Sequence, residues 1–251
     1  MTDRKVENRK LAILFDVDDT LYDMTQPFEK AYRDVFYDKY SQLDWKPVYV
    51  ASRKHSDEVF EASQRGEISM DDMYVYRWSK AMEDFGAVIS REEALHFQKV
   101  YQNYQKVLSM TETIKDMLTL CCQKGIVMGV ITNGPSKHQW NKTKALGLSE
   151  WIPDEAVIVS EDVGVMKPDP EIFRAAECKL KLSESGVKRE DCWFVGDTFE
   201  TDIKGAMAAG WRTIWFNRRA YPMSVKQPDY MVEQEEELLQ VIRELIRSEK
   251  S

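Results

Sequence analysis

Residues 11–20 of the chain are LAILFDVDDT, an apolar run followed directly by a cluster of aspartates. The run 11–15 (LAILF) is short and apolar on both faces, which is typical of a strand buried inside a parallel sheet. Polar residues also follow four similar runs, which occupy residues 126–131 (IVMGVI), 156–159 (AVIV), 192–195 (CWFV) and 213–216 (TIWF). The chain is therefore expected to contain a parallel sheet whose strands end in polar residues.

Helical patterns separate these strand runs. Residues 111–124 carry apolar side chains at helical spacing and end before a glycine, and residues 170–182 and 202–209 are also predicted to be helical. Strands that alternate with helices predict right-handed βαβ units, so the expected fold class is α/β with a doubly wound parallel sheet.

One long segment interrupts the alternation. Residues 22–108 contain no buried strand run, and their apolar residues follow helical spacing. This segment is predicted to be a helical domain inserted after the first strand, so that residues 1–21 and 109–251 form the sheet domain. Residues 234–250 are predicted to form one amphipathic helix.

Composition narrows the class of protein. The 251 residues include 43% hydrophobic side chains, and the formal net charge of -8 argues against broad binding to nucleic acid or anionic membrane. The apolar runs are shorter than the ~20 residues that span a bilayer. The polar start of the chain has no signal core, so a cytoplasmic protein is expected. The cysteines, which are expected to be reduced packing residues, are Cys121, Cys122, Cys178 and Cys192.

Polar side chains at the strand ends are expected to meet in space, because parallel strands present their carboxyl ends to one crevice. The residues concerned are Asp16, Asp18, Thr132, Asn133, Lys167 and Asp197. Two aspartates as close as Asp16 and Asp18 repel each other unless a cation intervenes, and Mg²⁺ prefers such oxygen ligands. One carboxylate can then act as a nucleophile, and the other can carry a proton.

The remaining motifs are weaker when taken singly. Thr132 and Asn133 could hold phosphate oxygens, but Asn-Gly is also a common turn. Lys167 could neutralise a phosphoryl group, although a lysine in a proline-rich loop is usually a surface residue. Asp197 could complete a metal site, and Asp202 could cap the next helix or touch a metal-bound water. Their shared order along the chain favours the functional interpretation.

Together these motifs resemble those of the haloacid dehalogenase superfamily of hydrolases. The first matches Asp-x-Asp-x-Thr at residues 16–20, the second and third match at Thr132 and Lys167, and the fourth matches Gly-Asp at residues 196–197 with Asp202. The resemblance implies a Rossmann-like core and a helical cap made of the inserted segment.

The same resemblance implies a role for each residue. Asp16 would form an aspartyl-phosphate, and Asp18 would be the general acid and base, with its backbone carbonyl on Mg²⁺. The phosphoryl group would be bound by Thr132 and Lys167, while Asp197 would ligate Mg²⁺ and Asp202 would support it.

The implied activity is Mg²⁺-dependent hydrolysis of a small phosphate monoester, for example a nucleotide or sugar phosphate, by a monomer or homodimer. Asp18 favours phosphoester chemistry because an alkoxide leaving group needs a proton and a halide does not. A sugar phosphomutase, a 2-haloacid dehalogenase and a non-catalytic binding module remain alternatives. Aromatic residues of the cap could contact a substrate, although helical spacing favours packing: Tyr74, Tyr76, Trp78 and Phe85.

Overall fold

The computed structural model of the protein describes residues 10–222 and 227–248. Its residues divide into two compact units, Met1–Asp23 with Ser109–Ser251, and Met24–Leu108. We call the first the sheet unit and the second the helical unit. The helical unit begins at Met24. The sequence analysis placed the start of the inserted segment two positions earlier, at residue 22.

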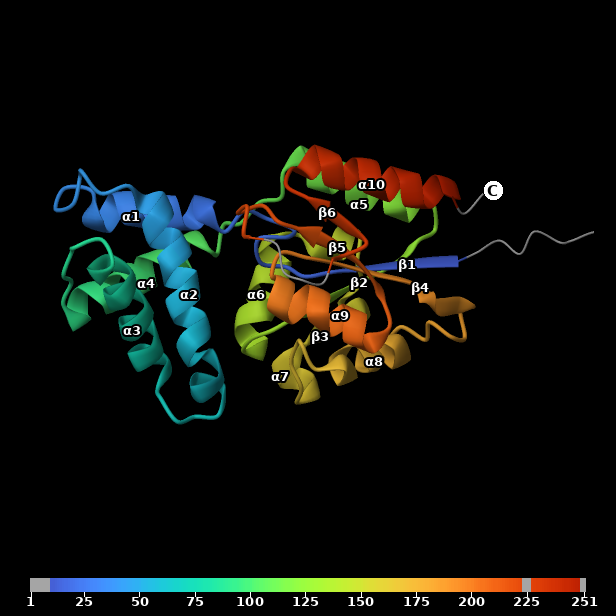
Figure 1. The fold of residues 1–251 in the computed structure, drawn as a ribbon, viewed down its shortest axis with the longest axis horizontal. Coiled ribbons are helices and arrows are strands. Elements are labelled where there is room, and N and C mark those ends of the chain that lie inside the picture. Colours follow the sequence, from blue (N-terminus) through green and yellow to red (C-terminus); the bar gives the residue numbers. More distant parts are fainter. Residues whose placement is uncertain (1–9, 223–226, 249–251) are drawn as a thin grey trace, which may run out of the picture. The chain divides into compact units, whose positions relative to one another are not determined.

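A six-stranded parallel sheet forms the centre of the sheet unit (Figure 1). Its strands are β1 Lys10–Phe15, β2 Val127–Thr132, β3 Val157–Val159, β4 Val187–Gly196, β5 Arg212–Phe216 and β6 Tyr230–Val232. They lie in the order β3-β2-β1-β4-β5-β6, which is the doubly wound order of Rossmann-like folds. The predicted α/β fold class is therefore confirmed, and the strand order reverses beside β1.

Helices cover both faces of this sheet (Figure 1). The helices α5 (Glu112–Gln123) and α10 (Glu235–Ser248) pack together on one face, and α8 (Pro170–Lys179) and α9 (Lys204–Ala209) pack together on the other. The remaining helical segments are α6 Ser136–Ala145, α7 Ser160–Val163, two 3₁₀ turns at Leu148–Glu150 and Asp154–Ala156, and a π-helical turn at Phe199–Ile203.

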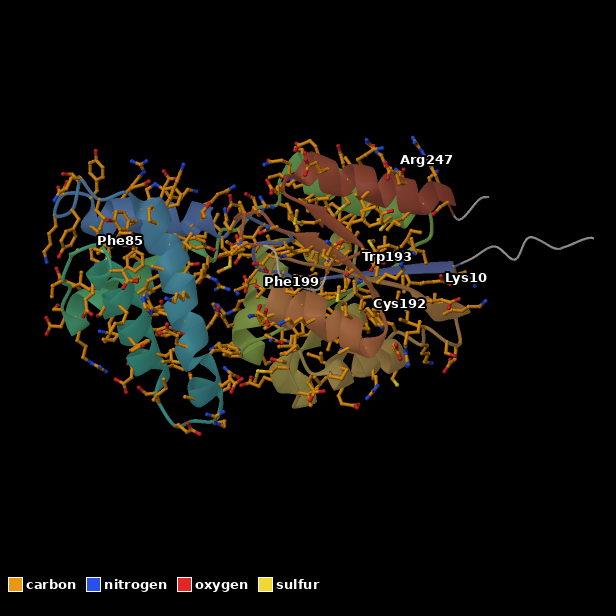
Figure 2. All side chains as sticks on the ribbon, in the orientation of Figure 1. Lys10, Phe85, Cys192, Trp193, Phe199 and Arg247 are labelled. Carbon is orange, nitrogen blue, oxygen red and sulfur yellow. The ribbon has the colours of Figure 1, made fainter. Side chains whose placement is uncertain are left out.

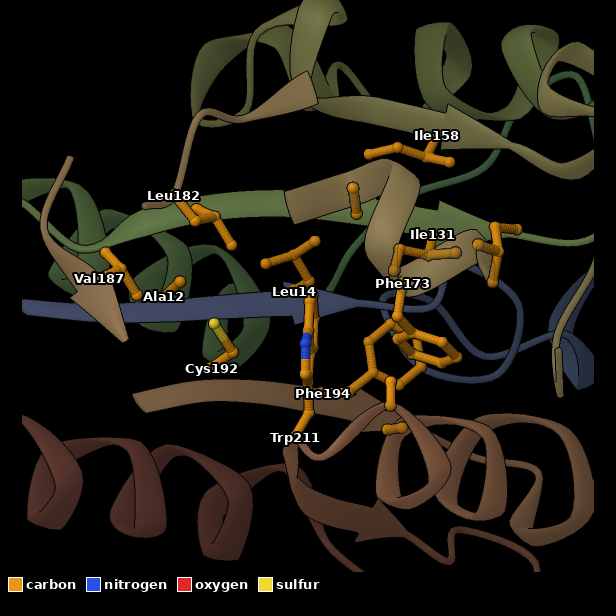
Figure 3. Close-up of a cluster of buried hydrophobic side chains, with 14 residues drawn as sticks. Ala12, Leu14, Ile131, Ile158, Phe173, Leu182, Val187, Cys192, Phe194 and Trp211 are labelled. Atoms are coloured by element: carbon orange, nitrogen blue, oxygen red, sulfur yellow. The ribbon is translucent and has the colours of Figure 1, made fainter. Parts of the chain in front are cut away.

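One buried cluster joins the sheet to α8 and α9 (Figure 3). Leu14 of β1 and Phe194 of β4 are fully buried there, and Phe173 of α8 packs edge-on against Phe194 with ring centroids 5.2 Å apart. Cys192 also lies in this cluster (Figures 2 and 3). Burial of this apolar surface fixes the strand register, and with it the level at which each strand ends.

The helical unit contains α1 Thr25–Phe36, α2 Trp45–Gln64, α3 Met70–Glu83 and α4 Arg91–Tyr104. Its core is aromatic, and Phe28 lies at the centre with ring centroids 5.2 Å from Tyr49 and 5.5 Å from Phe97. Ser90 begins α4 with a capping box, in which its hydroxyl accepts from the Glu93 amide and the Glu93 carboxylate accepts from the Ser90 amide.

Several elements differ from the expectations. The edge strand β6 was not predicted, the helix expected to reach residue 182 ends at Lys179, and the helix expected from residue 202 begins as a π-helical turn. Residues 249–250 of the expected final helix lie outside the described residues. No helix in 10–222 or 227–248 combines the length and the apolar character needed to span a bilayer.

Two expectations about single side chains also need correction. Cys121 and Cys192 are buried, as expected of packing residues, but Cys122 and Cys178 are exposed, because they lie on the outward faces of α5 and α8. Among the aromatic residues of the helical unit, Trp78 is buried in the core, whereas Phe85 is 41% exposed (Figure 2).

Candidate active site

Asp16 and Asp197 lie at the carboxyl edge of the sheet, at the ends of two neighbouring strands. Asp16 follows β1, and its backbone amide donates to the Val195 carbonyl of β4 at 2.9 Å. Asp197 follows β4, and its carbonyl accepts from the indole of Trp215 at 2.7 Å. Because β1 and β4 are adjacent where the strand order reverses, these residues occupy the position at which open α/β sheets bind ligands.

Asp202 joins these two aspartates from the π-helical turn after β4. One of its carboxylate oxygens accepts from the Thr198 amide at 3.0 Å. A Cβ atom at Gly196 would lie 2.5 Å from the same carboxylate, so only glycine leaves room for it. Oxygen atoms of Asp16, Asp197 and Asp202 all lie within 4.8 Å of one another.

Lys167 is the cation of this cluster. Its ammonium donates to Asp16 at 2.6 Å and lies 2.8 Å from Asp202, and the residue is only 2% exposed. The Phe194 ring lies beneath it, 5.1 Å from the nitrogen. The prediction that Lys167 meets the strand-end aspartates therefore agrees with the structure, and the surface-lysine alternative does not.

Burial changes the titration of both partners. It raises the pKa of Asp16 to about 7, with repulsion from Asp202 and Asp18 adding to the effect and Lys167 opposing it. Burial alone would lower the pKa of Lys167, but attraction to Asp16 and Asp202 raises it above its usual range, so the ammonium stays charged.

The donor set fits a hard divalent cation. Three carboxylates lie together and two of them contact one ammonium, which leaves an excess of negative charge in a buried place. Oxygen atoms on opposite sides of one Mg²⁺ are ~4.2 Å apart, so the spacing of these carboxylates suits a shared ion after small adjustments. Asp202, which was predicted to support the metal from nearby, is itself a member of this cluster together with Asp16 and Asp197.

Thr132 is the last residue of β2, the strand next to β1 in the sheet, and Asn133 follows it. The Asn133 amide pairs at both ends with the backbone of Lys167, donating to its carbonyl and accepting from its amide, each at 2.9 Å. The Thr132 hydroxyl donates to Gln139 at 3.1 Å, and Gln139 in turn donates to the Asn133 carbonyl at 2.9 Å. Direct contact of the Asn133 amide with phosphate stays a prediction, and the structure assigns this amide to holding the Lys167 loop.

Asp18 has partners that the sequence did not reveal. Its carboxylate accepts from the Tyr22 hydroxyl at 2.6 Å and forms an ion pair with Lys142, which is 4% exposed. Lys142 lies on α6, 124 positions away along the chain, so no local pattern could have identified it. Tyr22 and Lys142 therefore orient the Asp18 carboxylate, which lies close enough to Asp16 to raise its pKa.

The family model for haloacid dehalogenase-like hydrolases matches residues 11–210, which include the aspartates and lysines of the site. The chain belongs to this family. The predicted family membership is thereby confirmed.

Two relatives of known activity match almost the whole chain. The glyceraldehyde 3-phosphate phosphatase of Methanopyrus kandleri is 27% identical, and the match covers 94% of this chain and 98% of the relative. The human N-acylneuraminate-9-phosphatase is 29% identical, with 90% of each chain covered. These relatives and the family match confirm the predicted enzyme class, a phosphatase of the haloacid dehalogenase-like family.

A solved structure extends the likeness. The haloacid dehalogenase-like hydrolase YfnB of Bacillus subtilis, determined with bound magnesium, is 25% identical and has a TM-score of 0.66. The match covers 93% of this chain and 99% of that one. It supports the fold and provides one family member that binds Mg²⁺.

Proposed function

We propose that this haloacid dehalogenase-like enzyme hydrolyses phosphate monoesters of small metabolites in two steps, through a phosphoryl group carried on Asp16. The observation that carries this proposal is the buried contact between Asp16 and Lys167 beside Asp197 and Asp202. A nucleophilic carboxylate, a fixed ammonium and a set of metal ligands are the groups that phosphoryl transfer requires.

In the first step a carboxylate oxygen of Asp16 attacks phosphorus, and the bond between phosphorus and the ester oxygen breaks. Asp18 donates a proton to the departing oxygen, so the leaving group departs as an alcohol. In the second step water attacks the aspartyl-phosphate, Asp18 takes its proton, and inorganic phosphate leaves with Asp16 regenerated.

The phosphoryl oxygens need positive charge and hydrogen-bond donors during both steps. Lys167 supplies a buried ammonium, and its position is set by the two hydrogen bonds between its backbone and Asn133. The Thr132 hydroxyl, which donates to Gln139 in this structure, would turn to a phosphoryl oxygen. Low exposure of these groups strengthens each electrostatic interaction.

Mg²⁺ is the cation that best suits the carboxylate cluster. Asp16 and Asp197 would hold it with the backbone carbonyl of Asp18, and Asp202 would bind it directly or through water. When bound, the ion offsets the negative charge of the carboxylates and of the phosphoryl group.

The proposal is tested with p-nitrophenyl phosphate in the presence of Mg²⁺. We expect the wild-type protein to release phosphate, and we expect both EDTA and Asp16→Asn to reduce the rate to background. Asp38→Asn, which changes an aspartate on the helical unit, serves as the control and should keep the rate. Turnover that persists in Asp16→Asn would contradict the covalent mechanism.

A further inference from the structure

A closed turn after β5 carries two arginines that have no role in the chemistry above. The Asn217 side chain closes this turn by donating to the Tyr221 carbonyl at 2.9 Å and accepting from the Tyr221 amide at 2.8 Å. Arg218 and Arg219 lie between these two residues, and both are partly buried. The turn belongs to the sheet unit and follows the carboxyl end of β5, the strand next to β4. It therefore lies at the edge of the sheet that carries the candidate active site.

Both arginines contact Asp19, in the loop that follows β1. Arg219 donates to the two oxygens of the Asp19 carboxylate, at 2.6 and 3.3 Å, and also pairs with Asp23. Arg218 donates to the Asp19 backbone carbonyl at 3.2 Å and pairs with Glu235 of α10 at 2.8 Å. Asp19 is only 3% exposed, so these contacts hold both its side chain and its backbone inside the protein.

The backbone of Asp19 adopts an uncommon conformation. Its φ is 56°, in the left-handed region that a residue with a Cβ atom rarely adopts. This rotation, together with ψ of Asp18, sets the direction of the peptide group between the two residues, and so the direction of the Asp18 carbonyl. The amide of Leu21 closes the same loop by donating to the Val17 carbonyl at 3.0 Å. Such a conformation persists only when its surroundings hold it, and the contacts of Asp19 with the two arginines do so.

We propose that Arg219 is a positioning residue of the metal site, which holds the Asp18 carbonyl in the orientation that binds Mg²⁺. The inference rests on the proposed function, in which that carbonyl is a metal ligand. Without Arg219, the buried Asp19 carboxylate would lose its bidentate partner, and an uncompensated carboxylate favours a more solvated position. The backbone of Asp19 would then leave the left-handed region, and the carbonyl before it would rotate.

A positioning role and a purely electrostatic role predict opposite results. Arg219 is positively charged, so its removal by charge alone would tighten the binding of a cation. Loss of an oriented metal ligand would instead weaken the binding. The direction in which the Kd for Mg²⁺ changes therefore distinguishes the two roles.

Calorimetric titration of Mg²⁺ into the full-length protein, without substrate, measures this Kd and does not depend on activity. We expect the Kd to rise about tenfold or more in Arg219→Met, because a bidentate, charge-assisted contact is lost. Arg219→Lys keeps the charge without the planar fork, so its Kd should lie between those of Arg219→Met and wild type. Arg219→Lys carries the comparison if thermal unfolding shows that Arg219→Met is not folded.

Arg212→Met is the matched control, because it removes the same charge from the opposite end of β5. Arg212 is the first residue of this strand and pairs with Asp229 at 2.9 Å. It has no contact with Asp19 among the hydrogen bonds and ion pairs of the described residues, 10–222 and 227–248. Its Kd for Mg²⁺ should therefore match that of wild type.

A double variant tests whether Arg219 acts through Asp19. Arg219→Met with Asp19→Asn has the net charge of wild type, and asparagine visits the left-handed region without a charge that needs a partner. Its Kd for Mg²⁺ should lie between those of Arg219→Met and wild type.

Each outcome decides the inference. Weaker Mg²⁺ binding in Arg219→Met, with recovery in the double variant and an unchanged Kd in Arg212→Met, establishes the positioning role. An equal or tighter Kd in Arg219→Met overturns it, as does an equal loss in Arg212→Met or a double variant that binds no better than Arg219→Met. Wild-type protein that binds Mg²⁺ but hydrolyses no ester would contradict the phosphatase proposal, while calorimetry would still decide the role of Arg219. Wild-type protein that hydrolyses esters but binds no Mg²⁺ would overturn the inference.

Discussion

Lys167→Met should destabilise the metal-free protein strongly and make it more responsive to Mg²⁺. The ammonium of Lys167 forms two buried contacts, 2.6 Å to Asp16 and 2.8 Å to Asp202. Removing one partner of a buried ion pair costs about 3–5 kcal/mol, because the remaining charges stay desolvated without compensation. Three mutually repelling carboxylates would remain, and bound Mg²⁺ would offset more of their charge than it does in wild type.

Urea unfolding in EDTA and in Mg²⁺ measures both effects. In EDTA the free energy of unfolding should fall by about 3–5 kcal/mol relative to wild type. Mg²⁺ at a hundred times its Kd stabilises a folded protein by about 2.7 kcal/mol. Lys167→Met should bind Mg²⁺ more tightly than wild type does. At one fixed Mg²⁺ concentration, the free energy of unfolding should therefore rise more in Lys167→Met than in wild type.

Lys204→Met is the control, because Lys204 is only partly buried and pairs with the exposed Glu200 of the preceding π-helical turn. Its effect should stay within about 1 kcal/mol. Equal stability of Lys167→Met and wild type in EDTA would refute the reasoning, as would an equal response of the two proteins to Mg²⁺.

Three further changes test other parts of the structure. Gly196→Ala should weaken Mg²⁺ binding at least about tenfold in calorimetry, because its Cβ would displace the Asp202 carboxylate. Lys142→Met should lower kcat/KM more for an alkyl phosphate than for p-nitrophenyl phosphate, because a poor leaving group depends most on an oriented Asp18. Burial lowers the pKa of His55, but hydrogen bonds to its two carboxylate partners raise it overall above 6.5. The folded helical unit therefore binds more protons than the unfolded one between pH 6.5 and the raised pKa. The free energy of unfolding should fall as pH rises through this range. His55→Gln should remove this fall when unfolding in urea is followed at several pH values.

Matched controls separate these effects from general destabilisation. A Cβ at Gly129 would meet the Ala156 carbonyl at 2.9 Å, so Gly129→Ala should lose stability while keeping its Mg²⁺ affinity. Lys144→Met changes an exposed lysine of α6 and should leave kcat/KM unchanged for both phosphate esters. His96→Gln changes an exposed histidine and should keep the pH dependence of unfolding seen in wild type. The first prediction is contradicted if Gly196→Ala keeps its Mg²⁺ affinity, and the second if Lys142→Met loses kcat/KM equally on both esters. The third is contradicted if the stability of His55→Gln depends on pH as that of wild type does.

Local sequence patterns were sufficient to predict the first five strands and several of the helices between them, but not α6 or β6. The five apolar runs correspond to β1 through β5, because each is buried on both faces and must be hydrophobic throughout. The strand β6 (Tyr230–Val232) was missed because it is only three residues long and lies at the edge, where Met231 is 42% exposed. The π-helical turn was missed because its single-residue offset leaves no periodic signal.

The candidate site was predictable where it depends on strand ends and less so where it depends on packing. Parallel strands necessarily bring Asp16 and Asp197 to one edge, so their proximity followed from the alternation of elements. The ion pair between Asp18 and Lys142 depends on how α6 is oriented, which no pattern in 136–145 specifies. Asp202 can approach the other two aspartates because Gly196 has no side chain. This close approach is a feature of the three-dimensional structure, and no sequence pattern indicates it.

Chemical trapping at Asp16 tests the central claim most directly. Wild-type protein that is turning over p-nitrophenyl phosphate with Mg²⁺ is quenched in acid and reduced with borohydride, which converts an aspartyl-phosphate to homoserine. Peptide mass spectrometry should then find homoserine at position 16, in an amount that increases when Asp18→Asn slows the attack of water. Homoserine at another aspartate, or none at position 16 during confirmed turnover, would contradict the account.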